Sequence, residues 1–351
     1  MRAGIAHGSG GKAARAVMQA VVLNARREIV LESRPEPELR SDQVIVEVDL
    51  CGICGTDLHA PRMAQVYRGG FVMGHEPSGR ISRVGDAVEG WEVGQRVAVN
   101  PNGNVCGRCV YCLSGRPNFC HQATMETALG LQMDGALAQR MAVFPGTLRA
   151  LPASMGRLEA AWVEPTATAL RAAVLAGDLK GAVVAVFGGG PIGQLACRIA
   201  AHRGADQVVL VEPAPERRRF GPASGADLTL SPAEAGGQLD ASTVDVVFEC
   251  SGSAAARAEA LRLLTPGGVL VNVGAGPGGG FDPDVVLLKE ITIRGSFVYG
   301  SEFDGAIELL ARGDIRVDDL TTEIAPVEDA LRAIDALRSA EVMKVFIAPN
   351  G

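Results

Sequence analysis

The most specific chemical signal in this sequence is a run of four cysteines, Cys106, Cys109, Cys112 and Cys120. Four thiolates at such short loop spacing can close a tetrahedral zinc site and leave no position open for chemistry. The residues between them are turn formers with little hydrophobic periodicity, as in a lobe that folds around a metal ion. A [4Fe–4S] cluster also uses four cysteines, but the bacterial ferredoxin spacing is different. The run therefore predicts a structural zinc.

A second set of possible metal ligands is dispersed along the chain. The segment CGICGTDLH contains Cys54, the triad GHE contains His75 and Glu76, and the segment WVEPTA contains Glu164. Each has a plain alternative explanation when it is taken alone, since a single buried histidine is more often part of a core than a ligand. Their joint occurrence beside the four-cysteine run favours a second metal site.

A catalytic zinc needs three protein ligands and one open position for a substrate. Cys54 and His75 are natural candidates for two of the ligands. Outside the four-cysteine run and Cys54, the remaining cysteines are Cys51, Cys197 and Cys250. Cys51 could instead form a redox pair with Cys54, and the other two fall in an expected helix and strand. The third ligand is then a carboxylate, supplied by Glu164 or Glu76.

A glycine-rich segment supplies the third chemical signal. It fits the pattern G-x-G-x-x-G with Gly188, Gly189, Gly190, Pro191, Ile192 and Gly193. The segment follows the apolar run VVAVF and opens a predicted helix, which is the context that dinucleotide binding requires. Gly188 would make the tight turn, Gly190 would let the backbone approach a diphosphate, and Gly193 would allow close helix–strand packing. The diphosphate would lie at the start of the helix. A plain strand–helix turn is the alternative.

An acidic residue indicates which nicotinamide cofactor would bind. Glu212 follows Gly193 by nineteen residues and ends the next predicted strand. A carboxylate there can accept hydrogen bonds from the adenosine ribose and would repel a 2′-phosphate, which favours NAD over NADP. The arginines 217–219 lie close by in the sequence and could tolerate a phosphate.

Two kinds of sequence pattern must position these residues. Up to about residue 168, short alternating segments separated by Gly, Pro and Asp turns predict strands at 43–50, 79–85, 96–100 and 136–143. After that, apolar runs at 183–187, 208–212, 244–250 and 269–274 alternate with helical segments, which predicts a parallel sheet covered by helices on both faces. The tail returns to helices at 304–312 and 328–338 and to a last strand. The fold class is α/β, with a β-rich unit and a nucleotide-type unit.

Composition and charge exclude several classes of protein. Apolar residues make up 47% of the chain and charged residues 21%, which is an ordinary globular composition. The net charge of −7 argues against a nucleic-acid partner. No apolar run is long enough for a membrane span, and no secretion signal is visible, so we expect a cytoplasmic protein whose cysteines stay reduced. Residues 1–17 are expected to be a disordered extension or a tag.

With these residues in view, the chain from Met18 onward resembles the zinc-dependent medium-chain alcohol dehydrogenases, especially the polyol, sorbitol and threonine dehydrogenase branch. The matching motifs are CGICGTDLH, GHEPSGRISRVGDAV, GQRVAVNP, EPTATALRA, VFGGGPIGQLA and ECSG, together with the four-cysteine run. The resemblance implies a GroES-like catalytic domain at 18–168 plus 300–351, with a zinc lobe at about 100–122. It implies a Rossmann NAD-binding domain, a doubly wound parallel sheet, at 169–299.

The resemblance also implies roles for the dispersed residues. Cys54, His75 and Glu164 would hold a catalytic zinc, and Glu76 would lie beside the metal or serve as its ligand. Thr56 and His59 would form a proton relay, and Asp57 would orient His75. Three departures from the family pattern affect only substrate details: Pro77 after GHE, Gln139 and Arg140 in place of an aromatic residue, and the leader.

The implied activity is the zinc- and NAD-dependent oxidation of a secondary alcohol on a polyol, sugar or cyclitol to the ketone, with the reverse reduction. Two zinc ions would bind per subunit. The alternatives are an amino-alcohol dehydrogenase of the threonine or aminocyclitol type, and a non-catalytic NAD-binding protein. The partners would be a small-molecule alcohol and further copies of the chain, in a homodimer or homotetramer that pairs through 291–299, with no nucleic acid and no membrane.

Overall fold

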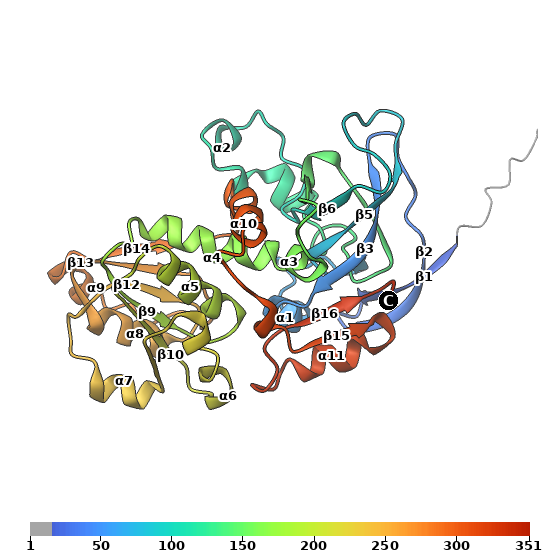
Figure 1. Cartoon of the computed structure of the whole chain (residues 1–351). Coiled ribbons are helices and arrows are strands. Elements are labelled where there is room, and N and C mark those ends of the chain that lie inside the picture. Colours follow the sequence, from blue (N-terminus) through green and yellow to red (C-terminus); the bar gives the residue numbers. More distant parts are fainter. Residues whose placement is uncertain (1–15) are drawn as a thin grey trace, which may run out of the picture.

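The computed structural model describes residues 16–351 of the chain. Two sheet-based units lie on opposite sides of a central layer of helices (Figure 1). That layer holds α3 (Arg157–Ala161), α4 (Val163–Ala176) and α10 (Glu302–Ala311). No helix within the described residues is long and apolar enough to cross a membrane.

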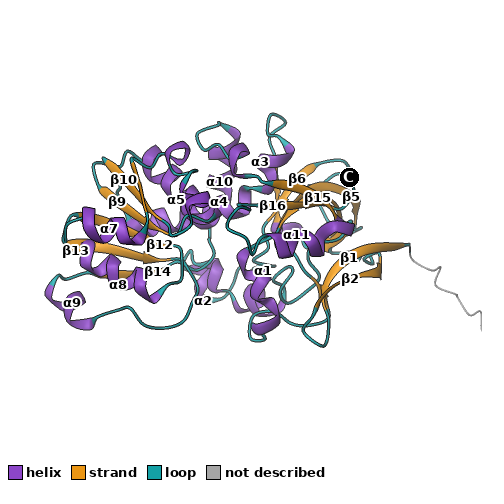
Figure 2. Ribbon diagram, turned by 90° about the horizontal axis from the view of Figure 1, so that it is seen from below, coloured by secondary structure: helices purple, strands orange, loops and turns teal. Residues whose placement is uncertain are grey.

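The first unit is a six-stranded sheet in which all neighbouring strands are parallel. Its spatial order is β11–β10–β9–β12–β13–β14, the doubly wound arrangement of a Rossmann fold. The strands are β9 (Val183–Phe187), β10 (Gln207–Val211), β11 (Leu228–Leu230), β12 (Val244–Glu249), β13 (Leu264–Asn272) and β14 (Thr292–Gly295). The connecting helices are α5 (Pro191–His202), α6 (Pro215–Arg218), α7 (Pro232–Gln238), α8 (Ala254–Leu263) and α9 (Pro283–Leu288), which cover the sheet on both faces (Figure 2). Because helices cover both faces, β9, β10 and β12 are mostly apolar and buried.

The second unit combines strands from the two ends of the chain, and its strand pairs are antiparallel except for the parallel pair β15–β16. Its seven-stranded sheet contains β15 (Glu323–Pro326), β16 (Val345–Ala348), β3 (Val44–Gly52), β5 (Glu76–Val84), β6 (Arg96–Val99) and β8 (Leu148–Ala150) in that order, with β7 (Arg140–Val143) paired to β3. A smaller sheet contains β2 (Ile29–Pro35), β1 (Val17–Leu23) and β4 (Phe71–Val72). The C-terminal strands thus rejoin the first half of the chain, as the sequence predicts.

Short helices and turns carry several functional segments of this unit. These are α1 (Gly55–His59), directly after β3, and α2 (Val110–Leu113), inside the four-cysteine segment. Helix α11 (Ala330–Ala336) follows β15. Helix α4 runs across residue 168, where the sequence predicts a boundary between two domains.

The core is continuous between the two units. One cluster of buried side chains joins Trp162 and Phe303 of the central helices to Leu195 of α5 and Phe346 of β16. A second cluster lies inside the antiparallel unit, and a third lies on the other face of the parallel sheet. The metal-binding candidates and the glycine turn therefore belong to one packed body.

Several expected segments differ in extent from the observed ones. The strand expected at 136–143 begins only at Arg140, although Ala138 makes an isolated bridge to Ala20. The expected helix 328–338 is a 3-10 turn followed by α11, which ends at Ala336. Of the expected leader, residues 1–15 lie outside the described part of the chain, and Val17 already belongs to β1.

Candidate metal centres and cofactor site

Cys54, His75 and Glu76 meet at the ends of two neighbouring strands. Their ligand atoms all lie within 4.8 Å of one another, one of two such groups among residues 16–351. Strands β3 and β5 are antiparallel and pair Gly52 with Glu76, so the residues after β3 and before β5 come together. A Cβ at Gly52 would collide with the Glu76 carboxylate, and glycine leaves that space open. The register of β3 and β5, and the absence of a side chain at Gly52, therefore allow Cys54, His75 and Glu76 to come together.

Asp57 fixes two members of this group. It is fully buried, and its Oδ2 accepts a hydrogen bond from the backbone N–H of Cys54 at 2.9 Å, which closes the first turn of α1. Its Oδ1 lies 3.4 Å from Nδ1 of His75. Burial opposes the ionised form, but the charge of His75 and the donors at Cys54 and Tyr67 keep the pKa of Asp57 below its usual value. Asp57 thus holds the backbone of Cys54 and lies against the imidazole of His75.

Glu76 has a buried cationic partner. Lys344, beside β16, forms an ion pair with Oε2 of Glu76 and donates to the carbonyl of Ile53 at 3.0 Å. Both side chains are only 3% exposed. Burial disfavours the charged lysine, but the Glu76 carboxylate raises the pKa of Lys344 above its ordinary value. The structure therefore holds Glu76 near Cys54 and His75, with one of its oxygens already paired.

Glu164, in the first turn of α4, faces the same group from the central helix layer. It is not among the residues whose ligand atoms lie within 4.8 Å of one another. The hydroxyl of Tyr299 donates to its Oε1 at 3.2 Å. Burial, and then repulsion from Glu76, raises the pKa of Glu164 to about 7. The geometry thus keeps both carboxylates available as a third ligand, Glu76 within the group and Glu164 beside it.

Thr56 and His59 lie three residues apart in α1 and therefore on one face of that helix. Thr56 is partly buried, whereas His59 is exposed. The phenol oxygen of buried Tyr67 lies 3.3 Å from Oγ1 of Thr56 and donates to Oδ1 of Asp57 at 3.0 Å. Thr56 is thus held near Cys54, and the exposed His59 lies on the same face of α1 in contact with solvent.

The charges of this site fit a divalent cation. One thiol and two carboxylates converge on a histidine, and Lys344 is the cation placed against them. Sulfur, imidazole nitrogen and carboxylate oxygen are the ligands that zinc takes in proteins. The buried thiol Cys51 does not compete, because burial raises its pKa far above the ordinary value, and it forms no disulfide but donates to the carbonyl of Gly52. A redox pair of Cys51 and Cys54 therefore finds no support.

The four-cysteine lobe forms the second group of ligand atoms within 4.8 Å. Sγ of Cys112 lies 3.5 Å from Sγ of Cys109 and 4.0 Å from Sγ of Cys106. Four sulfurs at 2.3 Å from a tetrahedral ion lie roughly 3.8 Å apart, so the lobe fits zinc. Backbone N–H groups of Arg108 and Cys109 lower the pKa of Cys106 to about 6, which favours a thiolate. All four candidate ligands are protein sulfurs, which is the ligand set of a structural site.

The glycine turn lies at the carboxyl end of β9. Gly188 has a φ of +97°, which a side chain would strain. A Cβ at Gly193 would collide with the Gly188 carbonyl, whereas a Cβ at Gly190 would meet nothing within 4 Å. Pro191 is the first residue of α5 and Ile192 the second. The open side of the turn at the helix start is thus where a diphosphate can approach.

Glu212 is attached to this turn. It is 4% exposed and directly follows β10. Its Oε2 accepts from the backbone N–H of Gly189 at 2.6 Å, and its Oε1 accepts from Ala214 at 2.9 Å. Arg218 donates to the backbone carbonyls of Glu212 and Pro213 rather than to the carboxylate. The charge of Glu212 is therefore not neutralised by Arg218.

Sequence reasoning missed three residues of the site: Lys344, Tyr67 and Tyr299. Each is almost fully buried and makes a polar contact to a predicted site residue. A lysine flanked by apolar residues in MKVFIA was the one visible signal, because lysine is seldom fully buried without a partner. The two tyrosines carry no comparable signal.

Asp57→Asn is expected to lower the zinc affinity of the Cys54 site by roughly 10- to 100-fold, the usual effect of losing a partner that orients a ligand. In wild-type protein the Cys54 N–H and the Tyr67 hydroxyl each donate to one oxygen of the Asp57 carboxylate. An asparagine must turn its NH₂ group toward one of these two donors. Competition with a chromophoric chelator measures the affinity. Asp42→Asn, whose native carboxylate pairs with exposed Arg40, is the matched control. Unchanged affinity in Asp57→Asn would contradict the orienting role.

The fold and the site together define a class of protein, a dehydrogenase in which a dinucleotide-binding sheet adjoins a metal-binding β unit. Two family models match the chain: Alcohol dehydrogenase GroES-like domain at residues 40–153 and Zinc-binding dehydrogenase at residues 191–312. D-xylulose reductase A of Aspergillus niger is 33% identical over 344 residues, which cover 93% of this chain and 95% of that protein.

Two solved structures extend the similarity. A protein described as a zinc-binding dehydrogenase from Sinorhizobium meliloti, bound to NADP, matches with a TM-score of 0.88 and 31% identity over 95% of this chain and 100% of that chain. L-idonate 5-dehydrogenase from Escherichia coli matches with a TM-score of 0.81 and 29% identity over 95% of this chain and 98% of that chain. This chain belongs to the zinc-dependent medium-chain alcohol dehydrogenases. It is an oxidoreductase that acts on CH–OH groups with zinc and a nicotinamide cofactor.

Proposed function

We propose that this protein is an NAD-dependent dehydrogenase that oxidises a secondary alcohol of a polyol or sugar to the ketone and catalyses the reverse reduction. The convergence of Cys54, His75 and Glu76 beside a Rossmann sheet carries the proposal. The relatives support the substrate class, because one is named a xylulose reductase and another an idonate dehydrogenase. Neither name supports the amino-alcohol alternative.

The proposed site has Cys54 and His75 as ligands of a catalytic zinc, with Glu164 or Glu76 as the third. Zinc bound there would act as a Lewis acid and lower the pKa of an alcohol substrate by several units. Thr56 would accept the substrate's hydroxyl proton and pass it along the face of α1 to His59, which is open to solvent. Tyr67 and Asp57 would hold Thr56 and Cys54 in place during this transfer.

The same proposal gives the four-cysteine lobe a structural zinc, so that each subunit holds two zinc ions. It gives the glycine turn the cofactor diphosphate and Glu212 the adenosine ribose. The buried carboxylate of Glu212, attached to Gly189, would repel a 2′-phosphate at this position. These contacts support NAD over NADP, although the structure from S. meliloti is bound to NADP.

Glu212→Ala tests the cofactor assignment. Removing the buried charge is expected to lower the ratio of kcat/KM for NAD to that for NADP by about 10- to 100-fold, or roughly 1.4 to 2.8 kcal/mol. Steady-state rates with each cofactor at a fixed alcohol concentration measure it. Glu216→Ala, in α6, is the control, because the N–H of Gly189 donates to Glu212 and not to Glu216. An unchanged ratio in Glu212→Ala would remove Glu212 from cofactor selection.

Activity screening after zinc quantification tests the function itself. We expect NAD reduction, followed at 340 nm, with one or more polyols, sugars or cyclitols, and none with threonine or aminocyclitols. Removal of zinc by a chelator should abolish turnover and its return should restore it. Full turnover in a metal-free sample, or turnover with amino alcohols alone, would overturn the proposal.

Domain limits, assembly and location remain part of the proposal. The catalytic domain would cover 18–168 plus 300–351 and the cofactor domain 169–299. The edge strand β14 has all four residues exposed, which supports pairing of two copies through 291–299 into a homodimer or homotetramer. A cytoplasmic location is also a prediction.

A further inference from the structure

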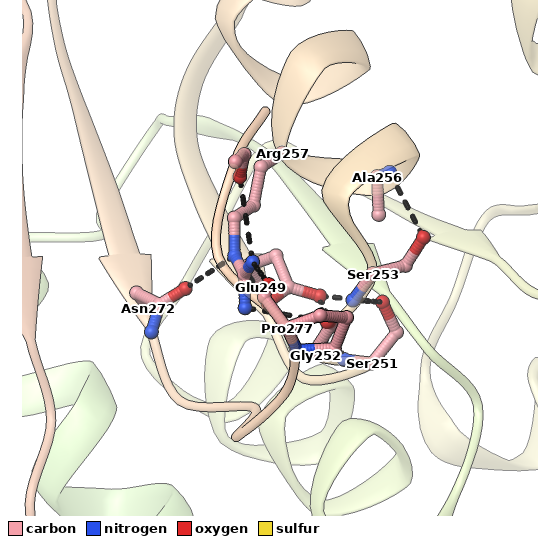
Figure 3. A network of polar contacts seen from close by, with 9 residues as sticks. Glu249, Ser251, Gly252, Ser253, Ala256, Arg257, Asn272 and Pro277 are labelled. Atoms are coloured by element: carbon pink, nitrogen blue, oxygen red, sulfur yellow. Dashed lines mark hydrogen bonds and ion pairs between the residues drawn. The ribbon is translucent and has the colours of Figure 1, made fainter. Parts of the chain in front are cut away.

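Glu249, the last residue of β12, organises a backbone turn that the functions above leave unexplained. Its carboxylate is fully buried. One oxygen, Oε1, accepts three hydrogen bonds, from Ser251 N at 2.8 Å, Ser251 Oγ at 2.5 Å and Gly252 N at 2.9 Å (Figure 3). The path of the chain from β12 into α8 is therefore fixed by a single carboxylate oxygen.

Arg257, one turn into α8, connects this turn to a distant loop. Its Nε lies 3.6 Å from Oε2 of Glu249 and donates to Oδ1 of Asn272 at 3.1 Å. The terminal nitrogens donate to three backbone carbonyls, those of Gly252 at 3.3 Å, Pro277 at 2.7 Å and Gly279 at 3.4 Å. Figure 3 shows the guanidinium between the end of β13 and the loop that follows it. Arg257 is only 4% exposed, so water does not replace these contacts.

Arg257 holds the loop of residues 273–281. The backbone of Ser251 and Gly252 lies between this loop and the glycine turn of the cofactor site. A Cβ at Gly188 of the glycine turn would lie 2.9 Å from Ser251 N. On the other side of this turn, Cβ atoms at Gly274 and Gly276 would collide with the backbone of Gly252. The turn that Glu249 builds is thus in close contact with both the glycine turn and loop 273–281.

The position of the loop in the sheet identifies the part of the cofactor it adjoins. A Rossmann sheet binds a dinucleotide as two halves, one over each set of three strands. Glu212 places the adenosine half over β9, β10 and β11. Loop 273–281 follows β13, at the carboxyl ends of the other three strands. It therefore lies where the nicotinamide half of the dinucleotide must lie.

The loop cannot hold this position by its own sequence. Five of its nine residues are glycine: Gly274, Gly276, Gly278, Gly279 and Gly280. Glycine loses more conformational entropy on ordering than any other residue. The ring of Phe281 lies over the Arg257 guanidinium, with 5.6 Å between the ring centroid and Cζ, so the same side chain also contacts the far end of the loop.

We propose that Glu249 and Arg257 are positioning residues that hold loop 273–281 as a wall of the nicotinamide half of the cofactor site. The pair selects one conformation of a glycine-rich loop before the cofactor arrives. The inference rests on the binding of a nicotinamide dinucleotide and not on the identity of the alcohol. Both residues act through the backbone that they hold, at Gly252, Pro277 and Gly279.

Arg257→Met tests the proposal, because methionine keeps an apolar stem and removes every donor. Binding is measured with zinc-loaded, full-length protein and two probes: NADH, followed by its fluorescence, and AMP, which contains the adenosine half alone, followed by calorimetry. The Kd for NADH is expected to rise by about tenfold or more, because only a fraction of molecules then holds the loop in the competent conformation. The Kd for AMP is expected to stay within about twofold.

Two further variants keep the test decisive. The control is Arg262→Met. Arg262 lies at the opposite end of α8 and donates to the carboxylate of Glu259 and the carbonyl of Leu239, so its replacement should leave both Kd values unchanged. Arg257→Lys, with a compact charge that cannot reach all acceptors, should show a smaller rise for NADH and carries the test if Arg257→Met does not fold. Equal weakening of NADH and AMP, or no weakening of either, would overturn the proposal. Because wild-type protein is measured with NADH in the same series, cofactor binding itself is tested separately.

Discussion

Cys54→Ser is expected to lower kcat by at least about 1,000-fold while the protein stays folded. A hydroxyl is a poor zinc ligand compared with a thiolate, and loss of the metal removes several kcal/mol of transition-state stabilisation, each 1.36 kcal/mol of which is tenfold in rate. The local backbone should survive, because Cys54 is the N-cap of α1 and serine is among the best N-cap residues. The Asp57 carboxylate can still accept the N–H of residue 54.

Three measurements check this result. The zinc content should fall from two ions to one per subunit, kcat should fall at saturating cofactor and alcohol, and the melting temperature should change by no more than about 2 °C. Cys51→Ala, three residues upstream in β3, is the matched control and should keep both zinc ions and its turnover. Near-normal turnover in a Cys54→Ser sample that has lost one zinc would exclude the proposed catalytic role.

Cys109→Ser is expected to destabilise the protein and to lower its activity indirectly. The four-cysteine lobe has almost no core of its own, since Val110, Leu113 and Phe119 are exposed and no residue of α2 is buried. Metal coordination must therefore supply the stability of this segment. We expect the melting temperature to fall by roughly 5 °C or more, which at 2–4 °C per kcal/mol is about 2 kcal/mol.

The loss of activity follows from what the lobe holds. The side chain of Asn118 donates to the carbonyl of Phe297 at 3.0 Å, and Asn102 donates to the carbonyl of Tyr299 at 3.2 Å. The rings of Phe119 and Phe297 are stacked at 6.0 Å. Tyr299 in turn donates to Glu164 beside the catalytic group. A loosened lobe therefore releases a segment that positions a candidate ligand.

Limited proteolysis distinguishes this variant from Cys54→Ser. Both should lose one zinc ion, but only Cys109→Ser should be cut within 100–122 and melt at a lower temperature. Ser114→Ala, in the same lobe, removes a hydroxyl that donates to the carbonyl of Tyr111 and should behave as wild type. Wild-type stability and protease resistance in Cys109→Ser would show that the lobe does not depend on its metal.

The strands, the glycine turn and the four-cysteine lobe could be predicted from the sequence because the patterns that indicate them are local. The lobe gathers its four sulfurs from fifteen residues, and the glycine turn joins one strand to the next helix. The central parallel strands are mostly apolar because both faces of that sheet are covered. Boundaries were less predictable, as at 136–143, where tertiary pairing sets where a strand begins.

The environment of the catalytic group depends on contacts that are far apart in the sequence. Lys344 is 268 residues from its partner Glu76, and Tyr299 is 135 residues from Glu164. The sequence by itself determined which residue types could bind zinc and a dinucleotide, because spacing and local pattern carry that information. The tertiary structure alone showed that Glu76 lies within the group of Cys54 and His75 while Glu164 lies beside it, and that Lys344 is the buried cation paired with Glu76. Antiparallel pairing of β3 with β5 and the return of β16 bring those charges together, and neither pairing is encoded in a local pattern.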